Sequence, residues 1–270
     1  MSRLPKVTEF TVDSLVQALI QVQAWMKGQT DGDLCWFRGV KDAKLALLPG
    51  AYWRQNYKEI HALLQFSQEG RAFADVGELD DWRTYYLAQH NGVPTRLLDW
   101  TENFITALFF AVDGWKGDTR PCVWIVRPSQ VNSLSINWAG LISPERNDEV
   151  NAWMPTKVEA GSQKVATKDG QWVYDSSKPL ALYPRKNNSR MIAQQGTFTV
   201  HGTLKVPLEQ WIIREAPDTH GQIICKIVFS KKVKPEVILP ELAGLGLRRS
   251  TIYPDLYNFV LQMKEQHGWA

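Results

Sequence analysis

The sequence has few cysteines and no grouping of residues that is typical of a metal site. Its 270 residues include three cysteines, Cys35, Cys122 and Cys225, which lie far apart. It contains no Cys-x-x-Cys pair and no Cys/His cluster with ligand spacing. An odd number of scattered cysteines does not form a disulfide scaffold. We therefore expect a protein of the reducing cytoplasm that binds no metal.

Long hydrophobic runs are also absent. No segment approaches the ~20 consecutive apolar residues that a membrane-spanning helix needs. The opening residues, MSRLPKVTEF, lack the apolar centre of a signal peptide. These absences predict a cytoplasmic protein with no membrane partner.

Neither sign of charge dominates. The chain has 31 Lys and Arg residues against 28 Asp and Glu residues, which gives a net charge of +3. This mildly basic balance is compatible with an anionic ligand but does not require nucleic acid.

The sequence shows no internal repeat, low-complexity segment or flexible linker, which favours a single domain over residues 1–270. Apolar runs predict strands near 34–40, 121–127 and 222–229, and amphipathic periodicity predicts helices such as 11–27. The predicted fold class is α+β, with a central mixed or antiparallel sheet flanked by helices. The core motifs fall in 34–115 and 180–260, joined by an elaborated connection over 129–178.

The first predicted strand ends in a charge. Arg38 and Gly39 follow the apolar residues of the run from Leu34. A guanidinium at the end of an apolar strand needs an anion, either an internal carboxylate or a ligand phosphate. Gly39 allows another backbone or a ligand to approach closely.

The stretch from Asp80 to Val112 places polar side chains between two apolar helical faces. Buried polar groups without partners cost about 1–3 kcal/mol each, so this stretch is either a structural network or a site. We expect a helix capped by Asp80 or Asp81 that runs to about His90, and then a turn over 95–101 that leads into a second helix capped by Thr101. At the start of this second helix, Asp99 would occupy the anion position and pair with Arg96. Otherwise the unpaired amides of the helix start would be free to bind an external anion.

These motifs together resemble the FRG domain family, which is named for a Phe-Arg-Gly triplet. The triplet here is Phe37-Arg38-Gly39, and the strings LAQHNGVPTRLLDWT (87–101) and ALFFA (107–111) follow it. Arg190, QQGTFT (194–199) and YPDL (253–256) resemble the downstream pattern. The resemblance covers most of residues 34 to 260, except about 129–178. It implies a bacterial or phage-related protein with a role in antiphage defence or as a toxin.

The strand that ends in aromatic-Arg-Gly is also similar to the first strand of arginine-serine-glutamate ADP-ribosyltransferases. In those enzymes the arginine holds the ribose and pyrophosphate of NAD. This resemblance implies a related fold, NAD as substrate and a protein or nucleic acid as acceptor. The Ser-Thr-Ser block of that family has no clean match, and its Glu-x-Glu or Gln-x-Glu strand is absent. Asp99 is then the best candidate for the catalytic carboxylate, and Glu159 is the second.

We expect the pocket between the strand that ends at Arg38 and the loop from His90 to Thr101. The expected catalytic residues are Asp99, His90 and Gln195, and the expected nucleotide-binding residues are Arg38, Gly39, Gln89, Arg96 and Thr101. Two alternatives remain open. One is a non-catalytic module that binds a nucleotide or nucleic acid, with stacking on Trp36, Trp100 or Tyr86. The other is an interaction protein in which the polar stretch is a buried scaffold.

Overall fold

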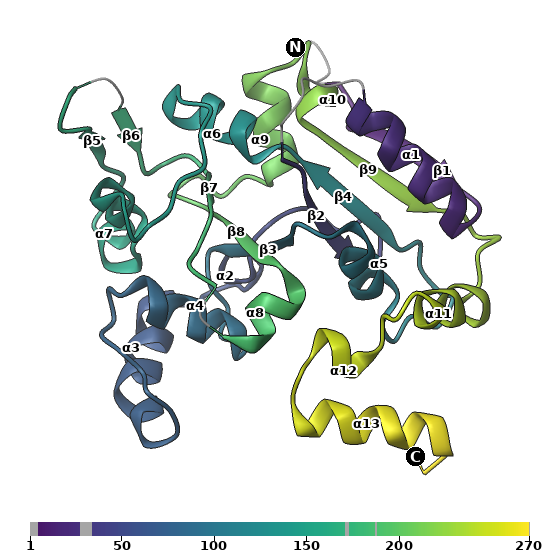
Figure 1. Cartoon of the computed structure of the whole chain (residues 1–270). Coiled ribbons are helices and arrows are strands. Elements are labelled where there is room, and N and C mark those ends of the chain that lie inside the picture. The colour runs from purple at the N-terminus through teal and green to yellow at the C-terminus, as the bar shows by residue number, and fades with distance from the viewer. Residues whose placement is uncertain (1–4, 28–33, 171–172, 187, 270) are drawn as a thin grey trace.

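The structure is a computed structural model, and it describes residues 5–27, 34–170, 173–186 and 188–269. A seven-stranded sheet has the order β1-β9-β4-β2-β3-β8-β7, with helices on both of its faces (Figure 1). The pairing of β1 with β9 is parallel and the other pairings are antiparallel. The strands are β1 (Thr8–Val12), β2 (Trp36–Val40), β3 (Leu97–Thr101), β4 (Cys122–Val126), β7 (Leu180–Leu182), β8 (Gly196–Val200) and β9 (Ile224–Phe229). This confirms the predicted α+β fold with a mixed sheet flanked by helices.

The described parts of the chain contain thirteen α-helices. They are α1 (Leu15–Lys27), α2 (Gly50–Trp53), α3 (Glu59–Glu69), α4 (Trp82–His90), α5 (Phe104–Val112), α6 (Pro128–Ile136), α7 (Pro155–Glu159), α8 (Ser189–Gln194), α9 (Leu208–Glu215), α10 (His220–Ile223), α11 (Pro235–Gly244), α12 (Arg249–Ile252) and α13 (Leu256–His267). Two 3₁₀ helices, Gly70–Ala72 and Asp148–Trp153, and a hairpin of β5 (Lys164–Ala166) and β6 (Val173–Asp175) complete the elements. None of the helices that the structure describes is long and apolar enough to cross a membrane.

The core lies on both faces of the sheet because successive strand residues point to opposite sides. Phe37 packs with α1, α5 and α11 on one face. Its neighbour Trp36 is fully buried on the other face, with Trp100, Trp124 and the α9 residue Trp211. A third cluster fills the space between β8, α4 and the 3₁₀ helix Asp148–Trp153.

Two predicted helix boundaries are wrong because the residues near each of them form strands of the sheet. Residues 8–12 form the edge strand β1, so the helix predicted over 11–27 begins at Leu15. The predicted turn over 95–101 contains strand β3, in which Thr101 pairs with Phe37 and with Gly196. The cap of α5 is therefore Asn103, whose Oδ1 accepts hydrogen bonds from two amides of the first turn.

Candidate functional site

A cavity of about 440 Å³ opens where strands β2 and β3 separate. These strands pair only at Phe37 and Thr101, whereas β2 pairs with β4, and β3 with β8, over five residues each. The consecutive residues 37–41 all line this cavity, so it receives side chains from both faces of the sheet. We call it the β2–β3 cavity.

Arg38 fills the gap between the two strands. Its Nη1 donates a hydrogen bond of 2.6 Å to the carbonyl oxygen of Asp99 and lies 3.6 Å from Asp99 Oδ2. Backbone groups need new partners where two strands part, and the guanidinium supplies one here. Burial lowers the pKa of Arg38, and the nearby carboxylate of Asp99 opposes that shift. The internal carboxylate expected for this arginine is therefore Asp99.

Gly39 also lines the cavity, but its main effect is on packing. A Cβ atom at this position would lie 1.8 Å from the carbonyl oxygen of Ala107, in helix α5. Glycine thus allows α5 to pack against β2, and this contact fixes the strand that carries Arg38.

Two side chains hold the carboxylate of Asp99 at the cavity. Besides Arg38, the Nε2 atom of Gln89 donates to Asp99 Oδ2 over 2.7 Å, and Gln89 Oε1 accepts from Thr95 Oγ1 over 2.5 Å. The side chain of Asp99 is nevertheless 56% exposed, so a ligand can reach it. The predicted pairing of Asp99 with Arg96 is wrong. Arg96 directly precedes β3 and its guanidinium pairs with Glu59, whereas Asp99 lies within the strand beside Arg38.

His90, the last residue of α4, lines the cavity near Arg190 of α8. Burial lowers the pKa of His90, Arg190 lowers it further, and Asp99 and Asp255 oppose the shift. The imidazole is therefore neutral at neutral pH. The guanidinium of Arg190 lies 4.7 Å from the centre of the Tyr253 ring. Its buried Nε has no hydrogen-bond partner among the residues that the structure describes.

The charged lining of the cavity is mainly positive. Arg38, Lys41 and Arg190 contribute three cations against the single carboxylate of Asp99. Apolar and aromatic residues complete the wall, chiefly Phe37, Trp53, Tyr86, Trp100, Phe110 and Phe198. A mostly apolar cavity of this size with a few convergent polar groups is typical of a small-molecule site.

A second hollow of about 250 Å³ adjoins the first. It shares Arg38, Leu48, Trp53 and Gln89 with the β2–β3 cavity, and Arg54 lies at its edge. Arg38 consequently borders both spaces, and a ligand with two bulky ends joined by an anionic group would fit across it.

Some expected site residues lie elsewhere. Gln195 is exposed in a left-handed conformation (φ 48°) and borders a shallow hollow beside α1, while its neighbour Gln194 lines the cavity. Thr101 lines the cavity, but its hydroxyl donates to the Gln194 carbonyl and accepts from the Asn103 amide. Trp36 is fully buried in the core beside Trp100 and does not line the cavity, so it cannot stack on a ligand there.

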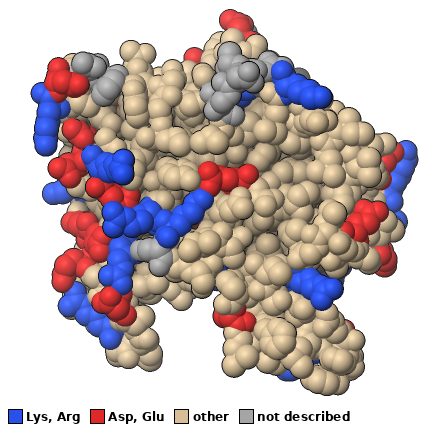
Figure 2. Space-filling view, viewed as in Figure 1, with Lys and Arg blue, Asp and Glu red and all other residues tan. Residues whose placement is uncertain are grey.

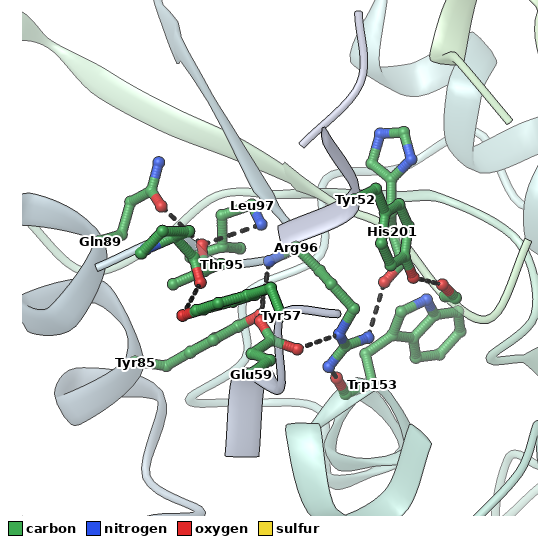
Figure 3. A network of polar contacts seen from close by, with 12 residues as sticks. Tyr52, Tyr57, Glu59, Tyr85, Gln89, Thr95, Arg96, Leu97, Trp153 and His201 are labelled. Atoms are coloured by element: carbon green, nitrogen blue, oxygen red, sulfur yellow. Dashed lines mark hydrogen bonds and ion pairs between the residues drawn. The ribbon is translucent and has the colours of Figure 1, made fainter. Parts of the chain in front are cut away.

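Arg96 belongs to a separate buried network (Figure 3). Its Nε donates to Glu59 over 2.7 Å, and its two terminal nitrogens donate to the backbone carbonyls of His201 and Trp153. Tyr85 donates to the same carboxylate. The guanidinium donors are thus directed at protein groups, and Arg96 does not line the β2–β3 cavity.

Reasoning from the sequence did not assign Lys41, Trp53, Arg190 or Thr197 to the site, and it left open whether the amide of Gln194 binds a ligand or caps backbone. Arg190 and Gln194 are four residues apart on α8 and therefore share a face, a spacing that could have indicated the pair. Lys41 follows the strand that carries Arg38. No local pattern points to Trp53, because it reaches the cavity through the path of the chain after β2.

Comparison with known families identifies one domain. Residues 33–119 match the family model of the FRG domain. This range contains the Phe-Arg-Gly triplet, α4, β3 and α5, whereas Arg190 and residues 253–256 lie outside it. No curated protein and no solved structure matches the chain. The ADP-ribosyltransferase-like fold thus stays a prediction.

Proposed function

We propose that this protein, which carries an FRG domain at residues 33–119, binds NAD in the β2–β3 cavity and releases nicotinamide from it. The observation that carries the proposal is the grouping of three cations around one accessible carboxylate, Asp99, in a cavity with aromatic walls. Phosphates favour arginine and lysine donors, and nucleobases favour aromatic surfaces.

The two adjoining hollows suit a dinucleotide. Arg38 borders both and is therefore placed for the pyrophosphate that joins the two halves of NAD. Lys41 and Arg190 add positive charge on the side of the larger hollow. Trp53, which is 53% exposed and borders both spaces, offers a face for a base.

Asp99 and His90 have the chemistry that N-glycosidic cleavage requires. When the bond from ribose C1′ to the pyridinium nitrogen breaks, its electron pair leaves with nicotinamide and C1′ becomes cationic. The carboxylate of Asp99 stabilises this centre. The oxygen of water then bonds to C1′, and the neutral imidazole of His90 accepts the proton that is released. If a nucleophile of a protein or nucleic acid replaces water, the same site transfers ADP-ribose.

The expected biological role follows from the family resemblance and this chemistry. A protein that consumes NAD, or that modifies a macromolecule with it, can arrest a cell. We therefore propose a role as an effector in conflict between bacteria and phages, either in defence or as a toxin.

A charge deletion at the cavity edge tests the binding step. We expect Lys41→Ala to weaken NAD binding about 5- to 10-fold, because a charge-assisted contact to phosphate is lost. The measurement is calorimetric titration, with mass detection of nicotinamide in the same samples. Lys44→Ala is the matched control, since Lys44 is exposed and does not line the cavity. Equal affinities for the two variants would contradict the placement of phosphate at this edge.

The pH profile tests the role of His90. Its pKa lies below the ordinary 6.5, so the neutral form persists as the pH falls to 6.5 and is lost only at lower pH. We expect kcat/KM for nicotinamide release to be level from pH 8 to about 6.5 and to fall below that. His90→Gln should lower the plateau and remove this acidic limb. A limb centred at or above pH 6.5 would exclude His90 as the base.

The second candidate is a non-catalytic nucleotide-binding module. It is favoured by the two contacts that Arg38 and Gln89 already make with Asp99. Such a module would show a thermal shift with NAD and no release of nicotinamide.

Nucleic-acid binding is less well supported. On the face seen in Figure 2, Lys and Arg side chains lie beside Asp and Glu side chains and form no continuous basic surface. Binding to nucleic acid would fall steeply as the salt concentration rises.

A further inference from the structure

One arginine that lines the β2–β3 cavity has no anionic partner in the described parts of the chain. Arg190 of α8 is half-buried, and it makes no ion pair and no hydrogen bond with the described residues. Its Nε is buried, whereas the terminal atoms Nη1 and Nη2 keep accessible surface. Arg38, by contrast, already donates to the carbonyl of Asp99 and lies beside the carboxylate of that residue. A guanidinium partly withdrawn from water is costly without an anion, so Arg190 is suited to an anion that a ligand brings.

Tyr253 holds this guanidinium in place without using its donors. The guanidinium carbon lies 4.7 Å from the centre of the Tyr253 ring. The ring in turn packs edge-on against Phe109 and Phe110 of α5, with centres 6.3 and 6.1 Å apart. A contact with an aromatic ring leaves the terminal N–H groups of an arginine free for a bidentate bond to phosphate. The side chain is therefore positioned in advance for an anion.

An internal carboxylate does not take the place of that anion. Asp255 caps α13, and its oxygens accept from the amide and the side-chain nitrogen of Asn258. These hydrogen bonds are the main cause of the lowered pKa of Asp255, and Arg190 has a smaller effect on it. The charge of Arg190 also reaches the cavity residue His90, whose pKa is lowered by burial and further by Arg190.

The residues proposed for cleavage lie in the same hollow as Arg190. Asp99 and His90 line the β2–β3 cavity but not the second, smaller hollow. Arg190 likewise lines only the larger space, whereas Arg38 borders both. The larger hollow thus contains a carboxylate for C1′, a base for water and an arginine of its own for a phosphate.

We propose that Arg190 binds the 5′-phosphate of the nicotinamide half, and that the larger hollow accepts nicotinamide mononucleotide as a substrate by itself. This rests on the function proposed above. The bond from C1′ to the pyridinium nitrogen breaks, and its electron pair leaves with nicotinamide. The oxygen of water bonds to C1′, the released proton passes to His90, and the second product is ribose 5-phosphate. The adenosine half of NAD adds affinity through the smaller hollow but is not needed for the chemistry.

Two ligands that differ only in the 5′-phosphate test this assignment. They are nicotinamide mononucleotide and nicotinamide riboside. We expect Arg190→Gln to weaken binding of the mononucleotide about 10- to 100-fold in calorimetric titrations, because a charge-assisted contact is lost. The weaker affinity for the riboside should not change. The wild type should release nicotinamide from the mononucleotide, and Arg190→Gln should raise KM far more than it lowers kcat.

Two further variants control for charge and for folding. Arg185→Gln removes the same charge from an exposed arginine that does not line the cavity, and it should bind the mononucleotide like the wild type. Arg190→Lys keeps the charge but loses the planar pair of donors, so its affinity should fall between those of the wild type and Arg190→Gln. The Tm of both Arg190 variants should stay within about 2 °C of the wild type, because no hydrogen bond or ion pair within the described chain is lost.

The outcomes separate this proposal from the function on which it rests. If the wild type releases nicotinamide from NAD but neither binds nor cleaves the mononucleotide, this proposal is overturned and the proposed function stands. Equal weakening of mononucleotide and riboside by Arg190→Gln would show that the arginine contacts no phosphate. A lower Tm of Arg190→Gln with unchanged mononucleotide affinity would assign the arginine to the fold and would also overturn the proposal. If the wild type binds neither NAD nor the mononucleotide, both proposals fail together.

Discussion

Replacing Asp99 by asparagine is expected to slow nicotinamide release about 100- to 1000-fold. This is the usual cost of removing a group that stabilises charge in a transition state. Asparagine keeps the shape and can still accept from Gln89, but it cannot stabilise a cationic C1′ through its charge. The measurement is mass detection of nicotinamide over time at saturating NAD. The affinity for NAD should change much less than the rate.

The fold is expected to survive this change. The Asp99 side chain is more than half exposed, and its ion pair with Arg38 has a separation of 3.6 Å, so little stability depends on the pair. The control is Asp75→Asn, which removes an exposed carboxylate paired with Arg83 on another part of the surface. Asp75→Asn should leave the rate unchanged. Normal release by a folded Asp99→Asn protein would exclude catalysis by this carboxylate and favour the binding module.

Local patterns predicted the parts of the site that depend on neighbours in sequence. The apolar run before Arg38 indicated a strand and a charge that needs an anion, although Arg38 lies in the middle of β2 and not at its end. A guanidinium taken out of water is costly without an anion, so an anionic partner was predictable from the apolar neighbours although its identity was not. The helix that ends at His90 was also predictable, with Asp80 or Asp81 as its cap. Its cap is local, and the structure shows Asp81 accepting from the Arg83 amide.

Pairing between distant residues was not predictable in the same way. Arg96 and Asp99 are close in sequence with opposite charges, which favoured an ion pair. The fold instead pairs Arg96 with Glu59, 37 residues earlier, and Asp99 with Arg38, 61 residues earlier. The single residue pair that joins β2 to β3 opens the cavity, and this register depends on the whole sheet.

Glu59→Gln is expected to destabilise the fold by about 3–5 kcal/mol, because it leaves the buried charge of Arg96 without its counter-ion. Arg96 is 3% exposed and the Glu59 side chain 12%. Burial by itself lowers the pKa of Arg96, but Tyr85 and Glu59 outweigh it and leave the pKa above its ordinary value. Arginine is not deprotonated in proteins at neutral pH, so the guanidinium stays charged when Glu59 is replaced. The Tm should fall by ~6–20 °C for a chain of this size.

Urea unfolding measures the effect, with a lower midpoint and an unchanged slope as the expected result. Asp75→Asn serves again as the control, since its ion pair with Arg83 is even shorter, at 2.5 Å, but exposed, and its removal should leave the midpoint almost unchanged. The double variant Glu59→Gln/Arg96→Met should lose much less stability than the two single changes summed, because no buried charge is left alone. Additive losses would show that the carboxylate and the guanidinium act independently.

The NAD affinity of Glu59→Gln, measured at a temperature where the variant is folded, should match that of the wild type. The network of Glu59 and Arg96 stabilises the strand that carries Asp99 but does not line the cavity.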